Sequence, residues 1–248
     1  MRQSRRLFPN LKQWRTYSPG FEVSYPAGRK RTAPAHLFCG EHEIPGARCF
    51  VGEHALLRLL SLDTSDPRLG LAHLRVPAVH LLYCWRCDIG DLSYTLGRNG
   101  EVKVRGEKEW RQALKKNGLT PEVIRQRNRG PLQTFPYPRY PDHFSGRHAV
   151  LRALTARRQQ AILAHALGQA GPRARLPVSR HQVGGLPYLA QGADYVPDCD
   201  ACAAAMTFVA VVADDCTDRR GFTGNSGAQV QFFICDSCAI VQALNVVD

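Results

Sequence analysis

The sequence predicts an α+β fold: two β-rich, pseudo-symmetric duplicated half-domains with zinc-ribbon-like knuckles and a helical, basic insertion between them. Three observations predict it. Two Cys-x2-Cys pairs flank strand-like runs near the end of the chain, a similar pattern occurs 151 residues earlier, and Arg-rich segments with helix signals lie between the two. Internal self-similarity of this kind is typical of a duplicated structural unit.

These observations divide the chain into an arm and one domain. Residues 1–35 hold four prolines and a net charge of +7, so we expect a poorly ordered basic arm or an extended wrapping segment. Residues 36–248 are expected to form a single pseudo-two-fold domain. Its parts are an N-terminal β half (36–105), a helical basic segment (106–175) and a C-terminal zinc-ribbon-like β half (176–248).

Composition sets the class of protein. The chain has 248 residues, of which 44% are hydrophobic and 22% charged, as in ordinary globular proteins. No apolar run approaches the ~20 residues that span a bilayer, and the basic N-terminus lacks the apolar core of a secretory signal. We therefore expect a cytoplasmic protein that does not bind membranes. In that compartment the nine cysteines are expected to be metal ligands or free thiols.

The N-terminal half is expected to begin with strands near 55–62 and 76–84. The Asn99-Gly100 dipeptide between two further strand-like runs predicts a hairpin. The helical segment follows, with helices expected over 107–118 and 120–130. Its longest helix is expected over 146–168, bounded by Ser145 and Gly168.

The C-terminal half carries the clearest chemistry. Strands expected near 206–213 and 228–235 separate two cysteine pairs, and a hairpin would return its end to the level of its start. The pairs would then meet and supply four thiolates to one structural zinc ion. A redox Cys-x-x-Cys is the alternative. The four expected ligands are Cys199, Cys202, Cys235 and Cys238, while Cys216 is expected to be a free thiol.

The repeat predicts a second zinc site in the N-terminal half. With an offset of 151 residues, Cys84 and Cys87 fall on Cys235 and Cys238. With the same offset, Cys49 falls on Asp200, between Cys199 and Cys202, and is the expected third ligand. Cys39 is the expected fourth, with His36 and His42 as competitors. The alternative is a decayed site whose cysteines serve as small buried apolar residues.

One motif carries a family resemblance. Val183, Gly184, Gly185 and Pro187 precede the first cysteine pair, and Phe232-Phe233 precede the second. This order resembles the family of the YwqG-like proteins and the eukaryotic programmed cell death protein 2. The resemblance implies a pseudo-symmetric fold, chaperoning of a small-subunit ribosomal protein in eukaryotic members, and binding, sometimes in toxin–immunity contexts, in bacterial ones. The strongly basic charge of this chain departs from what a holder of a basic protein needs.

The functional expectation is a zinc-stabilised protein-interaction module, chaperone-like or of the immunity type, with an acidic protein partner. Residues 101–180 carry a net charge of +12, against −6 for residues 181–248. Candidate partner-binding residues are Arg152, Arg157 and Arg158, together with the Val183, Gly184, Gly185 and Pro187 motif, for which packing is the alternative. Nucleic-acid binding through the arm and helices is the competing function.

An enzyme is not expected. The adjacent carboxylates of Asp214 and Asp215 are interpreted as part of a turn, because neighbours on a strand point to opposite faces. The run at 224–229 lacks the lysine and following helix of a phosphate loop.

Overall fold

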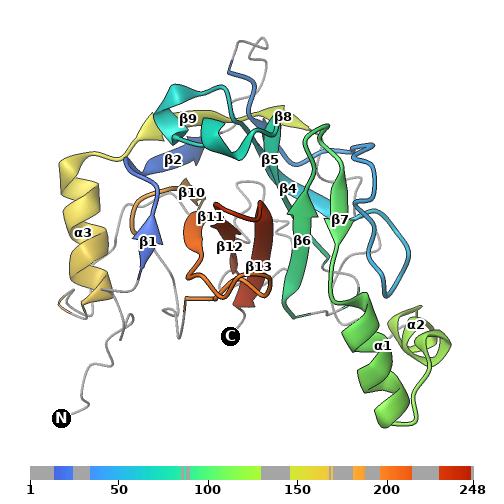
Figure 1. Ribbon diagram of the computed structural model, residues 1–248. Helices are drawn as coiled ribbons and strands as arrows, with labels where there is room; N and C mark the ends of the chain where they lie inside the picture. Colours follow the sequence, from blue (N-terminus) through green and yellow to red (C-terminus); the bar gives the residue numbers. More distant parts are fainter. Residues whose placement is uncertain are drawn as a thin grey trace, which may run out of the picture.

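The computed structural model describes residues 14–24, 34–84, 87, 90–129, 146–167, 169, 181–187, 196–213 and 229–246 (Figure 1). Within these residues the fold is rich in β-structure, with two sheets and three α-helices. Strand pairing is antiparallel except for one short parallel pair.

The larger sheet contains strands from both ends of the chain. Its order is β7 (Val102–Val104), β6 (Leu92–Leu96), β13 (Ile240–Val246), β12 (Gln229–Cys235), β11 (Thr207–Ala213), β10 (Gln182–Val183), β2 (Phe21–Ser24) and β9 (Val150–Ala153). The ninth strand, β1 (Arg15–Thr16), pairs in parallel with β11 beside β10. The smaller sheet has the order β5 (Ala78–Tyr83), β4 (Leu57–Asp63), β3 (Leu37–Phe38) and β8 (Arg147–His148).

The main core lies between the two sheets, and a second cluster lies on the other face of β11 and β12. Phe232 and Ile234 of β12 belong to the main core, whereas Phe233 and Cys235 belong to the second cluster. Alternate residues of β12 therefore lie on opposite faces, and both faces of the strand are buried.

The four strands predicted around the cysteines are confirmed as β4, β5, β11 and β12, with bounds within two residues of those expected. The predicted hairpin is also confirmed: β6 and β7 pair across Gly100, which has a φ of 84°. Two 3₁₀ helices, η2 (Pro67–Leu69) and η3 (Ala72–Leu74), lie between β4 and β5.

The long helix is corrected. Residues 14–24 of the expected arm contain β1 and β2, which fits the extended alternative rather than a poorly ordered arm, while residues 1–13 and 25–33 lie outside the described residues. The expected helix over 146–168 is instead β8 and β9 followed by α3 (Ala156–Ala166). Thr155 begins α3 by accepting a hydrogen bond from the Arg158 N–H. β9 pairs with β2, a partner more than a hundred residues away, so local helix propensity is overridden.

The remaining helices form where the sequence predicts them. These are α1 (Glu107–Lys116) and α2 (Pro121–Arg129). They lie beside β7, at the opposite end of the molecule from α3 (Figure 1). Among the described residues, no helix combines the length and the apolar character needed to cross a membrane.

Candidate metal centres

The four C-terminal cysteines predicted to bind metal lie together. All four Sγ atoms of Cys199, Cys202, Cys235 and Cys238 are within 4.8 Å of one another. The Cys202 and Cys235 sulfurs are 3.6 Å apart. Tetrahedral coordination with Zn–S bonds of ~2.3 Å places sulfurs about 3.8 Å apart. The spacing therefore fits one tetrahedral ion.

Two tight turns present these thiols. The first is closed by a bridge between Asp198 and Ala205, and in it the Cys199 N–H donates to the Ala204 carbonyl at 2.8 Å. Cys235 ends β12 and begins the second turn, where its carbonyl accepts the Ala239 N–H at 2.9 Å. The β11–β12 hairpin brings both turns to the same end of the sheet.

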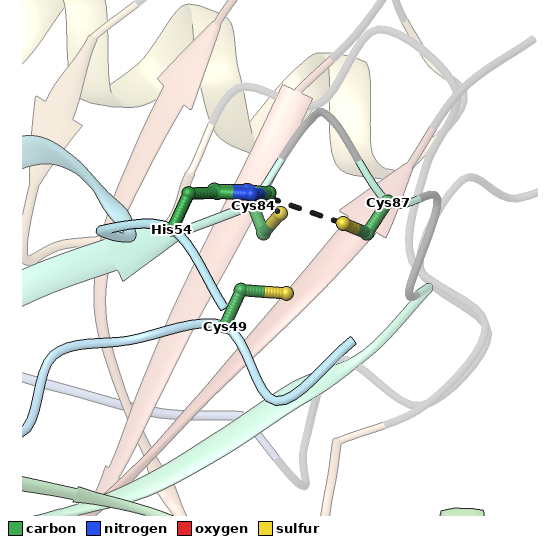
Figure 2. A group of neighbouring side chains, drawn as sticks. All are labelled: Cys49, His54, Cys84 and Cys87. Carbon is green, nitrogen blue, oxygen red and sulfur yellow. Dashed lines mark hydrogen bonds between the residues drawn. The ribbon is translucent and has the colours of Figure 1, made fainter. Parts of the chain in front are cut away.

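A second group lies in the N-terminal half and consists of Cys49, His54, Cys84 and Cys87 (Figure 2). Their ligand atoms are also within 4.8 Å of one another. The His54 Nε2 atom is 3.2 Å from the Cys84 sulfur and 3.9 Å from the Cys87 sulfur. A tetrahedral ion with Zn–N and Zn–S bonds of ordinary length needs about 3.5 Å between these atoms.

The predicted fourth ligand of this group is corrected. Cys39 lies apart from it, with its sulfur 3.8 Å from the Leu59 carbonyl. The two competitors are also engaged elsewhere: His36 contacts Asp66 at 3.0 Å, and His42 contacts the Leu56 carbonyl at 2.7 Å. His54 takes the place instead.

The turns that hold the two groups correspond residue by residue. A bridge between Arg48 and Ala55 closes the turn that holds Cys49, 150 residues before the Asp198–Ala205 bridge that closes the turn holding Cys199. The Cys49 N–H donates to the His54 carbonyl at 2.9 Å, and the Glu53 N–H donates to Cys49 at 2.8 Å. The same two bonds join Cys199, Ala204 and Ala203. The corresponding residues Glu53 and Ala203 both have a left-handed backbone, with φ of 59° and 56°.

This register explains how one group has an imidazole where the other has a thiol. Gly52 corresponds to Cys202, and His54 corresponds to Ala204. A Cβ atom at Gly52 would lie 2.5 Å from the His54 ring and 2.8 Å from the Cys87 sulfur. The His54 ring therefore fills the space that a cysteine at position 52 would use. An ungapped offset of 151 between the two halves conceals the correspondence of His54 with Ala204. Aligning Cys49 with Cys199 reveals it, because His54 then falls two residues after Cys202.

Within each group, the thiols shift one another's pKa values through hydrogen bonds. Hydrogen bonds from Cys84 and Cys87 lower the pKa of Cys49, while the bonds to Cys49 and Cys87, with burial, raise the pKa of Cys84. In the other group, hydrogen bonds to Cys202 and Cys235 raise the pKa of Cys238 to about 12. Full deprotonation of four crowded thiols requires a nearby cation. The donor chemistry of both groups fits such an ion.

The two groups differ in their surroundings. Cys49, Cys84 and Cys87 are buried in the main core, and the Phe50 and Trp110 rings pack nearby, 5.3 Å apart. In the C-terminal group Cys199 and Cys235 are buried in the second cluster. Cys202 is exposed and Cys238 partly exposed.

The Val-Gly-Gly-x-Pro motif lies inside the protein, which matches its packing alternative rather than an exposed binding loop. Val183, Gly184 and Pro187 are buried. Gly184 has a φ of 60°, and a Cβ atom there would lie 2.7 Å from the Tyr17 carbonyl oxygen. The Gly185 N–H donates to that same oxygen at 2.6 Å. The glycines therefore allow the N-terminal segment to approach closely.

The candidate arginines lie at one edge of the large sheet. Arg152 is exposed on β9, and Arg157 is exposed in the first turn of α3. Arg158 is partly buried and forms an ion pair with Glu22 of β2. Cys216, Asp214, Asp215 and most of the run at 224–229 lie outside the described residues.

Comparisons with known proteins add no family to this picture. No protein-family model matches the chain, and neither a curated protein nor a solved structure matches it significantly.

Proposed function

We propose that this protein is a zinc-stabilised protein-interaction module, chaperone-like or of the immunity type, built from two related halves with one structural zinc ion each. The observation that carries the proposal is the pair of four-residue groups at corresponding positions of two hairpins. Sets of four thiol and imidazole ligands are typical of structural zinc, because they leave no coordination position open for a substrate.

Further correspondences support the duplication. The short strands β3 and β10 pair with β4 and β11 in the same register. His36 precedes the first and His181 the second, and both are buried. Each Nδ1 atom accepts a backbone N–H at the end of the longer strand, from Asp63 at 3.1 Å and from Ala213 at 3.2 Å.

The proposed partner is a protein with an acidic surface. Its binding face would include the exposed Arg152 and Arg157 at the β9–α3 edge, where the long-range field of the basic middle segment attracts negative charge. A role in binding, rather than catalysis, agrees with the resemblance of the C-terminal motifs to the YwqG-like family.

Metal analysis tests the zinc component. Protein purified without added metal should contain two zinc ions per chain, and Cys84→Ser or Cys235→Ser should each reduce the content to one. A folded wild-type protein with no bound metal and eight titratable thiols among the described cysteines would overturn the proposal.

Affinity purification from the native cell at physiological salt tests the partner component. The wild-type chain should retain an acidic protein that the Arg152→Glu/Arg157→Glu variant loses. Lys103→Glu, an exposed change on β7 at the opposite edge of the same sheet, should retain it. Tight nucleic-acid binding, with log affinity falling by about 0.9 per neutralised phosphate as log salt rises, would instead favour the nucleic-acid function.

A further inference from the structure

The C-terminal cysteine loops hold two carboxylates that reach toward N-terminal residues. Asp200 follows Cys199 and forms an ion pair with Arg105 at 3.0 Å, just beyond β7. Asp236 follows Cys235, and its Oδ1 atom is 3.0 Å from the His73 Nε2 atom of η3. The loops that would wrap the metal are therefore also the loops that contact the N-terminal half.

Asp236 is the centre of a small network. Its second oxygen accepts a hydrogen bond from the Thr207 hydroxyl at 3.2 Å, at the start of β11. Its first oxygen also accepts a hydrogen bond from the Tyr17 hydroxyl. One carboxylate thus joins a cysteine loop, the large sheet, the N-terminal half and the segment that precedes β2.

That segment, residues 14–20, is here named the N-terminal strap. Trp14 packs on Phe208 and Phe233, with ring centroids 5.7 and 5.5 Å away. Both phenylalanines belong to the cluster that includes Cys199 and Cys235. The strap pairs with β11 through only two residues. Its other contacts include the Trp14 stack, the Tyr17–Asp236 hydrogen bond, the Gly185–Tyr17 bond, the Tyr17–His73 ring contact and the bond from the Leu154 N–H to the Gly20 carbonyl.

We propose that the C-terminal metal site is a clasp for the N-terminal strap: an ion bound by Cys199, Cys202, Cys235 and Cys238 fixes Asp236 and the Phe208–Phe233 pair, and loss of the ion releases the strap. The inference rests on metal binding as proposed above. The four ligands come from two loops, so a bound ion would cross-link these loops, and its loss would remove that cross-link. Asp236 then loses its fixed position, and the strap loses the Tyr17–Asp236 hydrogen bond and the fixed surface on which Trp14 packs.

The N-terminal group supplies an internal control. The residue that corresponds to Asp200 is the apolar Phe50, which packs against Trp110 and has no carboxylate to form an ion pair. Emptying the C-terminal site should release the strap, whereas the Cys84 site can remain filled throughout. The exposure of Cys202 makes the C-terminal ion the accessible one of the two.

Hydrogen–deuterium exchange of the full-length protein tests the clasp, with zinc content measured on the same samples. Mild chelation, or Cys202→Ala, should remove one ion and increase exchange in peptides covering residues 14–20 by about tenfold or more, while exchange in β5 stays unchanged. Tyr17→Phe should raise strap exchange several-fold with two zinc ions still bound. Ser18→Ala, an exposed change in the strap, should leave it unchanged.

The outcomes separate this inference from the proposed function. Unchanged strap exchange after the C-terminal ion is removed would overturn the clasp while leaving structural zinc intact. Wild-type strap exchange in Tyr17→Phe would show that Asp236 does not hold the strap and would likewise overturn it. A protein that binds no zinc at all would overturn both proposals, and zinc content alone would show it.

Discussion

The two candidate metal centres share a backbone but not an environment. Each has a turn closed by the same bridge and the same pair of hydrogen bonds, followed by a hairpin that ends in a Cys-x2-Cys loop. The N-terminal centre has three thiols inside the main core and the partly buried imidazole of His54. The C-terminal centre has four thiols, one of them exposed, and its loops contact distant segments.

The same local turn therefore lies in two different environments. Within the core, three of the four candidate ligands are buried, so loss of a bound ion would cost packing as well as coordination. At the periphery Cys202 is exposed, and Asp200 in its turn and Asp236 in the second cysteine loop contact other parts of the chain. We expect the first centre to stabilise the fold and the second to respond to conditions.

The largest expected effect is on stability. Cys84→Ser removes a ligand and leaves a hydroxyl in the main core, so we expect a loss of about 4 kcal/mol or more in unfolding free energy. Cys238→Ser, at the partly exposed position of the other centre, should cost about half as much. Thermal unfolding followed by circular dichroism at saturating zinc measures both. Equal costs would remove the proposed division between core and peripheral centre.

The ligand exchange offers the next test. His54→Ala alone should weaken metal binding at the N-terminal centre by more than about 100-fold, since a bound ion loses one of its ligands. Gly52→Cys added to His54→Ala should restore it, because position 52 corresponds to Cys202. Cobalt substitution makes the change visible as charge-transfer absorption from four thiolates rather than three. If the double variant binds no better than His54→Ala, the register between the two turns is wrong.

A smaller difference concerns pH. His80 of β5 lies opposite Ser61, with which it shares a 2.9 Å hydrogen bond, and the matching residue of β12 is Gln231. Burial, with the nearby Arg58, lowers the pKa of His80 to about 4. Unfolded histidine binds its proton near pH 6.5, so the folded state loses stability as pH falls from 6.5 toward 4, by roughly 2 kcal/mol at pH 5.

The variant His80→Gln places the C-terminal half's residue in the N-terminal half and should remove this loss. Urea unfolding at pH 7 and pH 5 with saturating zinc compares the two proteins, and acid release of zinc is common to both. An identical decrease in wild type and variant would show that His80 does not set the pH response.

The smallest expected effect is kinetic. A chelator should remove zinc in two phases, with the C-terminal ion leaving about tenfold faster because Cys202 is exposed while Cys84 is nearly inaccessible. Zinc release followed with a chromogenic chelator gives both rates, and Cys202→Ala should abolish the fast phase alone. A single phase in the wild-type protein would contradict the ordering.

The sequence by itself determined the strands around the cysteines and all four members of the C-terminal candidate metal group. These depend on alternation, turn residues and the spacing of thiols along one hairpin, which are all local properties. It also identified three of the four members of the N-terminal candidate metal group. Only the tertiary structure decided the fourth, because His54 enters the site through a one-residue change of register that the cysteine spacing conceals.

The tertiary structure also decided which secondary structure the arm and the segment after Ser145 adopt. The local patterns of residues 14–24 and 147–153 predict an arm and a helix, yet both segments contain strands because they pair with strands far away in sequence. Pairing of that kind depends on which backbone groups remain free after the rest of the sheet has formed. The sequence of a segment does not contain that information, and the completed sheet does.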